Sequence, residues 1–286
     1  MFGDISKNIF AGRKLLIATK HQKEQVIAPI LEEALGVHCV VAENFDTDTF
    51  GTFSGEIERE NTPLATVRMK CLAAMSLMNI DLAVASEGSF GPHPSLYFIP
   101  ANEEYLILID RKYDLEIIVR ELSTDTNFGS SEVGSEEELF EFATNAKFPS
   151  HGLILRKSQN NHSVIEKDII DTESLKSIFK NLIDGQSSVF VETDMRAMFN
   201  PTRMKIIEAA AHKLVAKIKS FCPTCQMPGF GITDTIKGLP CERCGFPTKG
   251  ILSAIYTCQK CSFSQEIKYP NNVFTEKAMY CDICNP

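Results

Sequence analysis

Residues 221–286 of the chain are FCPTCQMPGFGITDTIKGLPCERCGFPTKGILSAIYTCQKCSFSQEIKYPNNVFTEKAMYCDICNP. Eight of the ten cysteines lie in this stretch as four CxxC pairs: Cys222/Cys225, Cys241/Cys244, Cys258/Cys261 and Cys281/Cys284. Each pair can direct two thiolates at one ion. Fifteen residues separate the first pair from the second, and nineteen separate the third from the fourth. The spacing predicts two four-cysteine zinc ribbons.

The order of the pairs favours a sequential arrangement, in which the first pair joins the second and the third joins the fourth. An interleaved arrangement also satisfies the spacing. Disulfides are the alternative chemistry, but they need an oxidising compartment, and the opening MFGDISKNIFAGRK contains no long apolar run and no cleavage-site pattern. We therefore expect metal sites in a cytoplasmic protein.

The predicted zinc sites are expected to be structural, because four cysteines fill every position around tetrahedral zinc and leave none for substrate. Residues 221–286 are also too few to build an ordinary core, so metal would supply much of their folding free energy. Acidic and basic side chains nearly cancel in this module, which does not favour binding to nucleic acid. A protein partner that docks on the ribbons stays an open alternative.

The composition predicts a globular protein with a larger domain ahead of the ribbons. The chain has 286 residues, of which 44% are hydrophobic and 23% are charged, and its net charge is −8. The acidic excess lies in residues 1–220, which disfavours nonspecific binding to nucleic acid or to an anionic membrane. No stretch approaches the length of a transmembrane helix. We expect an α/β domain over 1–220 and a double zinc-ribbon module over 221–286.

Hydrophobic periodicity predicts alternating strands and helices in the larger domain. The order of these segments indicates an α/β fold with a mixed sheet, flanked by helices and interrupted by an antiparallel region. The expected strands are KLLIAT from Lys14, VHCVVAE, DLAVAS, SLYFIP, EYLILID, DLEIIVREL, GLILRK and VFVET. The expected helices cover about 24–35, 62–78, 135–145, 174–184 and 201–220.

Acidic residues in two polar segments are candidate catalytic groups. The long loop DTDTFGTFSGE carries Asp46, Asp48 and Glu56, whose oxygens suit a hard cation such as Mg2+. The segment ASEGSFGPHP follows a strand and carries Glu87 and His93. Ligands of open α/β sheets bind beyond the carboxyl ends of strands, so we expect both segments to meet Lys20 and His21 in one cleft. Ordinary turn chemistry is the alternative for each.

Basic residues near helix starts are candidate phosphate ligands, since helix N-termini favour anions. Lys20, His21 and Lys23 lie between the first strand and the next helix, and Arg68 lies early in the helix that Thr62 caps. Two further candidates end strands: Asp110 as a metal ligand, and Arg196 in ETDMRAMFNPTRM. Solvated loop charges or a local Arg–Asp pair are the structural alternatives.

Two resemblances add to these observations. KLLIATKHQKEQV, GEIERENTPLATVRMKCLAAM and DLAVASEGSFG are similar, in order and type, to the inosine/xanthosine triphosphatase-like proteins, which hydrolyse aberrant purine nucleoside triphosphates with Mg2+. The similarity covers about 13–156. It departs where His21 replaces Asn and where one Gly follows Glu87. DTDTFGTFSGE, ASEGSFGPHP, ETDMRAMFNPTRM and the final CNP together resemble an uncharacterised bacterial family with a C-terminal cysteine-rich module.

Two classes of function follow. The first is a Mg2+-dependent phosphoanhydride hydrolase acting on a small phosphorylated ligand or nucleotide, in which carboxylates hold the metal and basic residues bind the phosphates. His93 or a carboxylate would accept the proton of the attacking water. The second is a noncatalytic protein that binds a ligand or a protein partner. A zinc-ribbon protein that binds nucleic acid would need scattered basic residues to converge in space.

Overall fold

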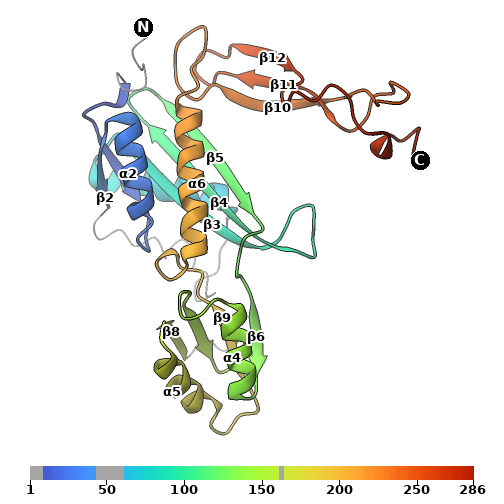
Figure 1. Ribbon diagram of the computed structural model, residues 1–286. Helices are drawn as coiled ribbons and strands as arrows, with labels where there is room; N and C mark the ends of the chain where they lie inside the picture. The colour runs from blue at the N-terminus through green and yellow to red at the C-terminus, as the bar shows by residue number, and fades with distance from the viewer. Residues whose placement is uncertain (1–8, 43–60, 161–163) are drawn as a thin grey trace. The chain divides into compact units, whose positions relative to one another are not determined.

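A computed structural model of the chain describes residues 9–42, 61–160 and 164–286 (Figure 1). The loop that carries Asp46, Asp48 and Glu56 lies outside the described residues. The chain forms two compact units. The large unit comprises Met1–Lys112 and Ile118–Val215, and the ribbon unit comprises Tyr113–Ile117 and Ala216–Pro286. No helix in the described ranges is long and apolar enough to cross a membrane.

A five-stranded mixed sheet forms the centre of the large unit, which confirms the predicted α/β class. Its order is β2-β1-β3-β4-β5, with β1 parallel to both β2 and β3, and β3 antiparallel to β4. The strands are β1 (Lys14–Ala18), β2 (His38–Val41), β3 (Leu82–Pro92), β4 (Pro100–Asp110) and β5 (Leu115–Ser123).

Helices cover both faces of this sheet (Figure 1). The helix α3 (Pro63–Met78) packs Val67, Cys71 and Met75 against buried strand residues on one face, while α2 (Glu24–Leu35) and α6 (Pro201–Ile218) lie on the other. Capping residues fix where these helices begin and end. Thr62 accepts the N–H of Ala65 at the start of α3, and Gly36 ends α2 in the left-handed conformation that glycine favours.

A second, four-stranded antiparallel sheet lies within the large unit, in the order β6-β9-β7-β8. Together with α4 and α5 it has its own apolar core, which includes Leu139, Leu153 and Phe179. Ser135 caps α4, as the sequence signal predicts, and Asp171 caps α5, which begins two residues before the expected start at 174. The elements are β6 (Ser130–Val133), α4 (Glu136–Asn145), β7 (Leu153–Arg156), β8 (Ile165–Ile169), α5 (Thr172–Ile183), β9 (Val189–Thr193) and η2 (Ala197–Phe199).

The ribbon unit is built on a three-stranded antiparallel sheet in the order β10-β11-β12. The strands are β10 (Gly231–Lys237), β11 (Ile251–Thr257) and β12 (Ser264–Lys268), and one short helix, η3 (Ala278–Tyr280), follows. Three cysteine pairs lie in turns that precede or join these strands, and the fourth lies in the turn after η3.

One predicted strand is wrong. The segment SLYFIP was expected to be extended, but residues 93–99 form the tip of the β3–β4 hairpin. The β3 strand instead continues through SEGSFGP and pairs as far as Pro92 with Pro100. Aromatic residues at 97 and 98 carry high strand propensity, but the His93 ring accepts the N–H groups of Ser95 and Leu96 and turns the chain there.

Candidate metal centres and candidate active site

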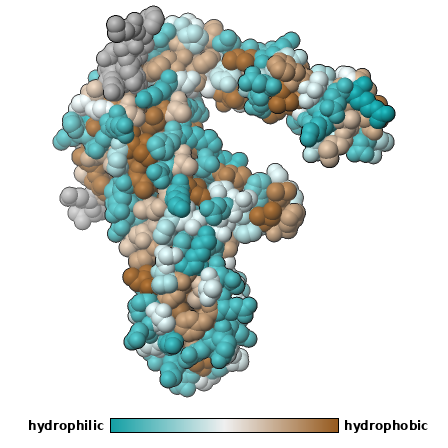
Figure 2. All heavy atoms as spheres, in the orientation of Figure 1, coloured by the Kyte–Doolittle hydropathy of each residue, from teal (hydrophilic) through white to brown (hydrophobic). Residues whose placement is uncertain are grey.

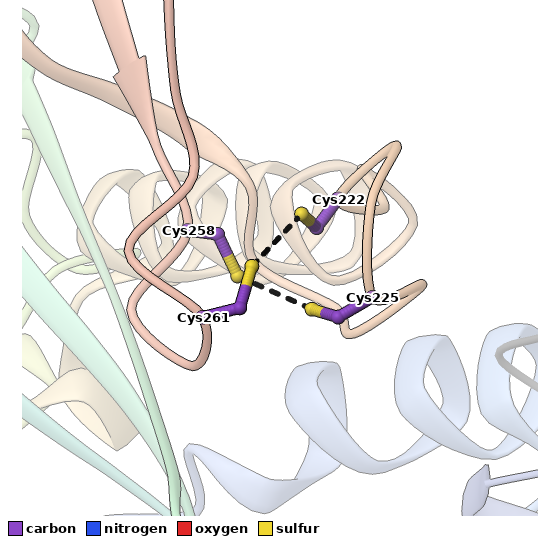
Figure 3. A group of neighbouring side chains, drawn as sticks. All are labelled: Cys222, Cys225, Cys258 and Cys261. Atoms are coloured by element: carbon purple, nitrogen blue, oxygen red, sulfur yellow. Dashed lines mark hydrogen bonds between the residues drawn. The ribbon is translucent and has the colours of Figure 1, made fainter.

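The eight cysteines of the ribbon unit form two groups that could each hold a metal ion. The first contains Cys222, Cys225, Cys258 and Cys261 (Figure 3), and the second contains Cys241, Cys244, Cys281 and Cys284. The first pair therefore joins the third, and the second joins the fourth. The expected sequential pairing is wrong, and the interleaved arrangement is the one that the chain adopts.

The length of β10 explains the interleaving. Seven strand residues separate the first pair from the second, and at about 3.3 Å per residue they carry the chain roughly 23 Å away. The β11 strand then returns antiparallel to β10, because Gly231 pairs with Thr257. Cys258 follows Thr257 directly, so the return brings the third pair back to the first.

The sulfur positions fit tetrahedral zinc. Four thiolates at about 2.3 Å from one ion would lie about 3.8 Å from one another. The observed Sγ–Sγ distances are 3.6 Å for Cys222–Cys261 and Cys225–Cys258. In the second group they are 3.9 Å for Cys241–Cys284 and 3.6 Å for Cys244–Cys281. A disulfide, with sulfurs about 2.05 Å apart, does not fit these distances.

Backbone hydrogen bonds hold each pair in the same tight turn. The residue after the second cysteine donates its N–H to the carbonyl of the first, at 2.9 Å in all four turns. The donors are Gln226, Gly245, Ser262 and Asn285. Three of these donors, Gln226, Gly245 and Ser262, have positive φ, which lets the chain reverse around the ion.

The same turns favour the thiolate form of the leading cysteine in the second group. Backbone N–H groups of Cys244 and Arg243 lower the pKa of Cys241 to about 7, against the opposing effect of burial. The Arg243 N–H lies 3.4 Å from the Cys241 sulfur. Thiolate is the form that binds metal, so these N–H groups favour metal binding by Cys241.

The two groups differ in what surrounds them. Around the first, Cys222 and Cys258 are buried with Phe230, and the Phe230 ring lies 5.7 Å from Tyr256 and 5.9 Å from Phe263. The second carries exposed apolar side chains: Phe246, Phe274, Met279, Tyr280 and Ile283. A single small aromatic core therefore supports one metal group and not the other.

In the large unit, buried charged side chains converge where β1 ends. Ala18 is the last residue of β1 and pairs with Ala85, while β3 continues for seven more residues to Pro92. This is the carboxyl end of parallel strands, where open α/β sheets bind ligands. Five buried residues gather there, and we call them the charge cluster: Lys23, Lys70, Glu87, Glu104 and Arg203.

Three members of the charge cluster form one network on the α2 and α6 face. The Lys23 ammonium donates to Glu104 Oε1 at 2.7 Å, and Arg203 Nη2 lies 3.2 Å from Glu104 Oε2. Lys23 also donates to Ser86 Oγ at 2.9 Å. Gly88 leaves room for the network, because a Cβ there would meet Arg203 Nη2 at 2.4 Å.

The other two members form an ion pair on the α3 face. Lys70 Nζ donates to Glu87 Oε2 at 2.6 Å, and both side chains are buried. Glu87 also acts electrostatically on Lys23, so the two parts of the charge cluster interact through the strand edge. Among the described residues, three buried cations and two buried carboxylates therefore meet at this edge of the sheet.

Burial changes the acidity of this network. Desolvation lowers the pKa of Lys23 to about 8, although Glu104 opposes the change. Burial raises the pKa of Glu104, but Lys23 and Arg203 outweigh burial and hold it below its ordinary value. Glu104 is therefore ionised near neutral pH, and Lys23 loses its charge at about pH 8.

Two buried polar atoms beside the charge cluster have no hydrogen-bond partner among the described residues. They are Oγ1 of Thr19, which follows the end of β1, and Oδ1 of Asn102, which lies two residues before Glu104 on the same strand face. A buried polar atom without a partner costs about 1–3 kcal/mol. A bound polar ligand could satisfy either atom.

The predicted phosphate ligands other than Lys23 lie in two places. Lys20 and His21 form the turn after β1, and Arg68 lies in α3; all three are half-buried near the strand ends that carry the charge cluster. Arg196 follows β9 of the second sheet and pairs with Asp194 and Asp168, as its structural alternative predicts.

His93 does not lie with Glu87, contrary to the expected single cleft, and Asp110, a candidate ligand for the same metal, does not lie with Glu87 either. His93 follows Glu87 by six residues of extended chain, roughly 20 Å, and its ring accepts backbone N–H groups at the hairpin tip. Asp110 pairs with Leu82 at the opposite end of β3. There it accepts two hydrogen bonds from Arg13, at 2.6 and 2.9 Å.

The described carboxylates do not form a magnesium site. Glu87 is bound to Lys70, and Glu104 is bound to Lys23 and Arg203, on opposite faces of the strand pair. Glu87 was expected to need a metal to balance Asp46, Asp48 and Glu56; among the described residues its ionic partner is Lys70. A magnesium role now rests on the residues of 46–56, which lie outside the described ranges.

The comparison with protein families matches residues 70–286 to DUF6671, described as a domain of unknown function. The chain belongs to this family. The matched range contains both cysteine groups and four of the five members of the charge cluster, Lys23 being the exception. No curated protein matches the chain. Neither comparison supports the resemblance of residues 13–156 to the inosine/xanthosine triphosphatase-like proteins.

Proposed function

We propose that the large unit of this DUF6671 protein hydrolyses a phosphoanhydride bond of a small phosphorylated ligand such as a nucleotide, and that the charge cluster binds the phosphates. The single observation behind the proposal is the burial of three cationic side chains, Lys23, Lys70 and Arg203, at the carboxyl edge of β1 and β3. Phosphates are the polyanions that such a site, already rich in N–H donors, accommodates.

Stability alone does not account for the charge cluster. Burying charges costs several kcal/mol per ion, and replacing a buried ionic network by apolar side chains is often neutral or stabilising. The two unpartnered polar atoms beside it add a further cost. Groups that a fold keeps at such cost are candidates for function, particularly where burial has changed the pKa of one of them.

Each group has a role in the proposed reaction. Lys23 and Arg203 would exchange part of their contact with Glu104 for phosphate oxygens, and Lys70 would orient Glu87. Water would attack phosphorus while the bond to the bridging oxygen breaks. Glu87 would accept the proton of that water and release it to solvent, and the leaving phosphate would keep the electron pair. Fixed positive charge favours the transition state because negative charge develops on the leaving oxygen.

The test is a phosphate-release assay of the zinc-loaded full chain with a panel of nucleoside di- and triphosphates and Mg2+. Glu87→Gln should lower turnover at least a hundredfold, because general-base residues contribute about 10²–10⁴. The matched control is Glu103→Gln on the neighbouring strand, where Glu103 pairs with Arg120 at the surface; its turnover should match the parent. No release with any nucleotide would favour the noncatalytic alternative instead.

A further inference from the structure

A buried histidine lies where the second sheet meets α6. The core of that sheet comes from its own strands and from α4 and α5, which carry hydrophilic side chains over much of their visible surface (Figure 2). After β9 the chain passes through η2 and enters α6 at Pro201. His151 precedes β7 by two residues and is only 5% exposed, and its ring contacts Thr202 in the first turn of α6. The ring therefore links the second sheet to the start of the helix that carries Arg203.

The hydrogen bonds around this ring require its neutral form. The Thr202 N–H donates to His151 Nε2 at 3.3 Å, and the Thr202 hydroxyl lies 2.9 Å from the same nitrogen. A backbone N–H can only donate, so Nε2 is an acceptor. On the other side of the ring, the Ser150 hydroxyl donates to the Lys147 carbonyl at 2.6 Å and therefore accepts from His151 Nδ1, 3.0 Å away. The single proton of the ring is thus on Nδ1.

His151 and Asn200 together cap the first turn of α6. The Arg203 N–H donates to Asn200 Oδ1 at 2.9 Å, and the N–H of the preceding residue, Thr202, donates to His151. N–H groups in the first turn have no partner within the helix, so side chains that accept them fix its start. Arg203 is the third residue of α6, and its backbone position therefore depends on both caps.

The Arg203 side chain connects the same junction to the charge cluster. Its Nη1 donates to the carbonyl of Met195, which lies between β9 and η2, and its Nη2 lies 3.2 Å from Glu104 Oε2. The whole residue is buried. Because packed interiors transmit displacements, a change in the first turn of α6 moves this guanidinium relative to Glu104.

A second proton on His151 would be opposed by its surroundings. Burial is the largest cause that lowers the pKa of His151 below its ordinary 6.5, and the charges of Lys147 and Lys205 add to it. The Lys147 carbonyl and the Asp125 carboxylate act in the opposite direction. A helix N-terminus also disfavours a cation. The cap is therefore complete above pH 6.5 and is lost as the pH falls through the lowered pKa of the folded protein.

We propose that His151 is a positioning residue for Arg203, and that its protonation releases the first turn of α6 and weakens anion binding at the charge cluster. A protonated Nε2 presents a proton to the Thr202 N–H, so that hydrogen bond is lost. The effect on anions rests on the proposed function, whereas the effect on the helix does not. Its sign is distinctive, because an added positive charge ordinarily strengthens anion binding.

NMR of the zinc-loaded full chain tests the positioning without any ligand. At about pH 7.5 the ring nitrogens should show a proton on Nδ1 and none on Nε2. As the ring takes up its second proton, amide hydrogen exchange of Thr202, corrected for intrinsic pH dependence, should accelerate at least about fivefold, the usual effect of losing a helix cap. A proton on Nε2 at pH 7.5, or Thr202 exchange that ignores the protonation of the ring, would overturn the proposal.

His151→Gln is the matched variant, because its side-chain carbonyl can accept the Thr202 N–H but does not titrate. It should keep Thr202 protected across the whole pH range, whereas His151→Ala, which has no acceptor, should leave Thr202 poorly protected throughout. His212→Gln replaces an exposed histidine of α6 and should behave as the parent does. A His151→Gln protein whose Thr202 exchange still responds to pH as in the parent would contradict the role of the ring.

Calorimetry with inorganic triphosphate then tests the effect on the charge cluster. The ratio of the parent's affinity to that of His151→Gln cancels the ionisation of the probe itself. This ratio should fall at least about fivefold as His151 is protonated. A constant ratio, with binding to both proteins at neutral pH, would overturn the link to Arg203 and leave the proposed phosphate site intact. If neither protein binds the probe at neutral pH, the proposed function fails together with this link, while the Thr202 exchange still decides whether His151 positions the helix.

Discussion

The two cysteine groups and the charge cluster both consist of chemically active side chains, but the first are positioned by local turns and the second by contacts between distant parts of the chain. Each cysteine group joins two CxxC turns, and every turn is shaped by its own backbone hydrogen bonds. The charge cluster joins side chains from separate elements; Glu104 and Arg203 are 99 residues apart. A site made of local turns is visible in the sequence, whereas a site made by tertiary packing is not.

The two regions also differ in what they contribute to stability. Structural zinc supplies folding free energy directly, about 10–16 kcal/mol in small zinc domains. The charge cluster lowers the free energy of folding little or not at all, since its Coulombic attraction is offset by desolvation. On the proposed function, the comparison therefore separates a region kept for folding from a region kept for ligand binding.

The largest predicted effect is the unfolding of the ribbon unit when its metal is removed. The three-stranded sheet has one small aromatic core around Phe230, so without metal it lacks enough buried apolar surface to stay folded. Titration with a strong chelator should release two metal equivalents per chain. In an NMR spectrum, the amide proton shifts of residues 221–286 should then collapse into the narrow random-coil range. Retention of the folded spectrum after complete metal loss would contradict this account of the unit.

Two double substitutions test the interleaved pairing. Cys222→Ser with Cys258→Ser removes two ligands from one group and should leave one metal equivalent per chain. Cys222→Ser with Cys241→Ser damages both groups and should leave none. Sequential pairing predicts the reverse assignment, so metal analysis of the two variants decides between the arrangements.

Within the charge cluster, removal of one charge should be far more damaging than removal of a matched surface charge. Glu104→Gln leaves Lys23 and Arg203 buried without their carboxylate, which should cost about 3–5 kcal/mol of unfolding free energy. Glu103→Gln removes an adjacent carboxylate that pairs with Arg120 at the surface, and should cost at most about 1 kcal/mol. Urea denaturation measures both. Equal losses would show that burial does not increase the contribution of Glu104 to the free energy of unfolding.

Much of the fold was predictable from local signals. The helix over 24–35 ends at Gly36, and Thr62 and Ser135 begin helices where capping signals place them. The strand expected at SLYFIP failed, because propensity favours extension there while the His93 ring imposes a turn. The strands β6 and β8 were missed, since SSEV and IEKDI are short and polar, and β6 also pairs with a strand, β9, that lies far along the chain.

The candidate site was predictable only in part. Lys23 and Glu87 follow from their positions after strands, since the strand ends of a parallel pair meet at one edge. Glu104 gave no local signal, because only the register of β3 with β4 places it opposite Gly88. Lys70 and Arg203 were visible as charges early in helices, yet nothing in the sequence shows that they face inward. The pairing of the cysteines likewise depended on the direction of β11.

The smallest predicted effect concerns pH. Burial lowers the pKa of Lys23 from 10.5 to about 8, so this lysine loses its charge above pH 8 in the folded protein but only near 10.5 when unfolded. Its contribution to the free energy of unfolding should therefore rise across that window, because the unfolded chain binds the extra proton. Phosphate affinity should fall by up to about tenfold per pH unit above 8. In Lys23→Arg, whose guanidinium stays charged, titration calorimetry should find no such fall; a parent with flat affinity would contradict the assignment.

The most direct test asks whether the charge cluster is kept for ligand binding. The triple variant Lys23→Met, Glu104→Leu, Arg203→Met removes all three charges of one network together, so its unfolding free energy should equal or exceed that of the parent. Calorimetric titration with a nonhydrolysable nucleoside triphosphate analogue is the deciding measurement. We predict that the parent binds the analogue and that the triple variant binds at least a hundredfold more weakly. Equal affinity in the two proteins, or no binding to the parent, would contradict the account.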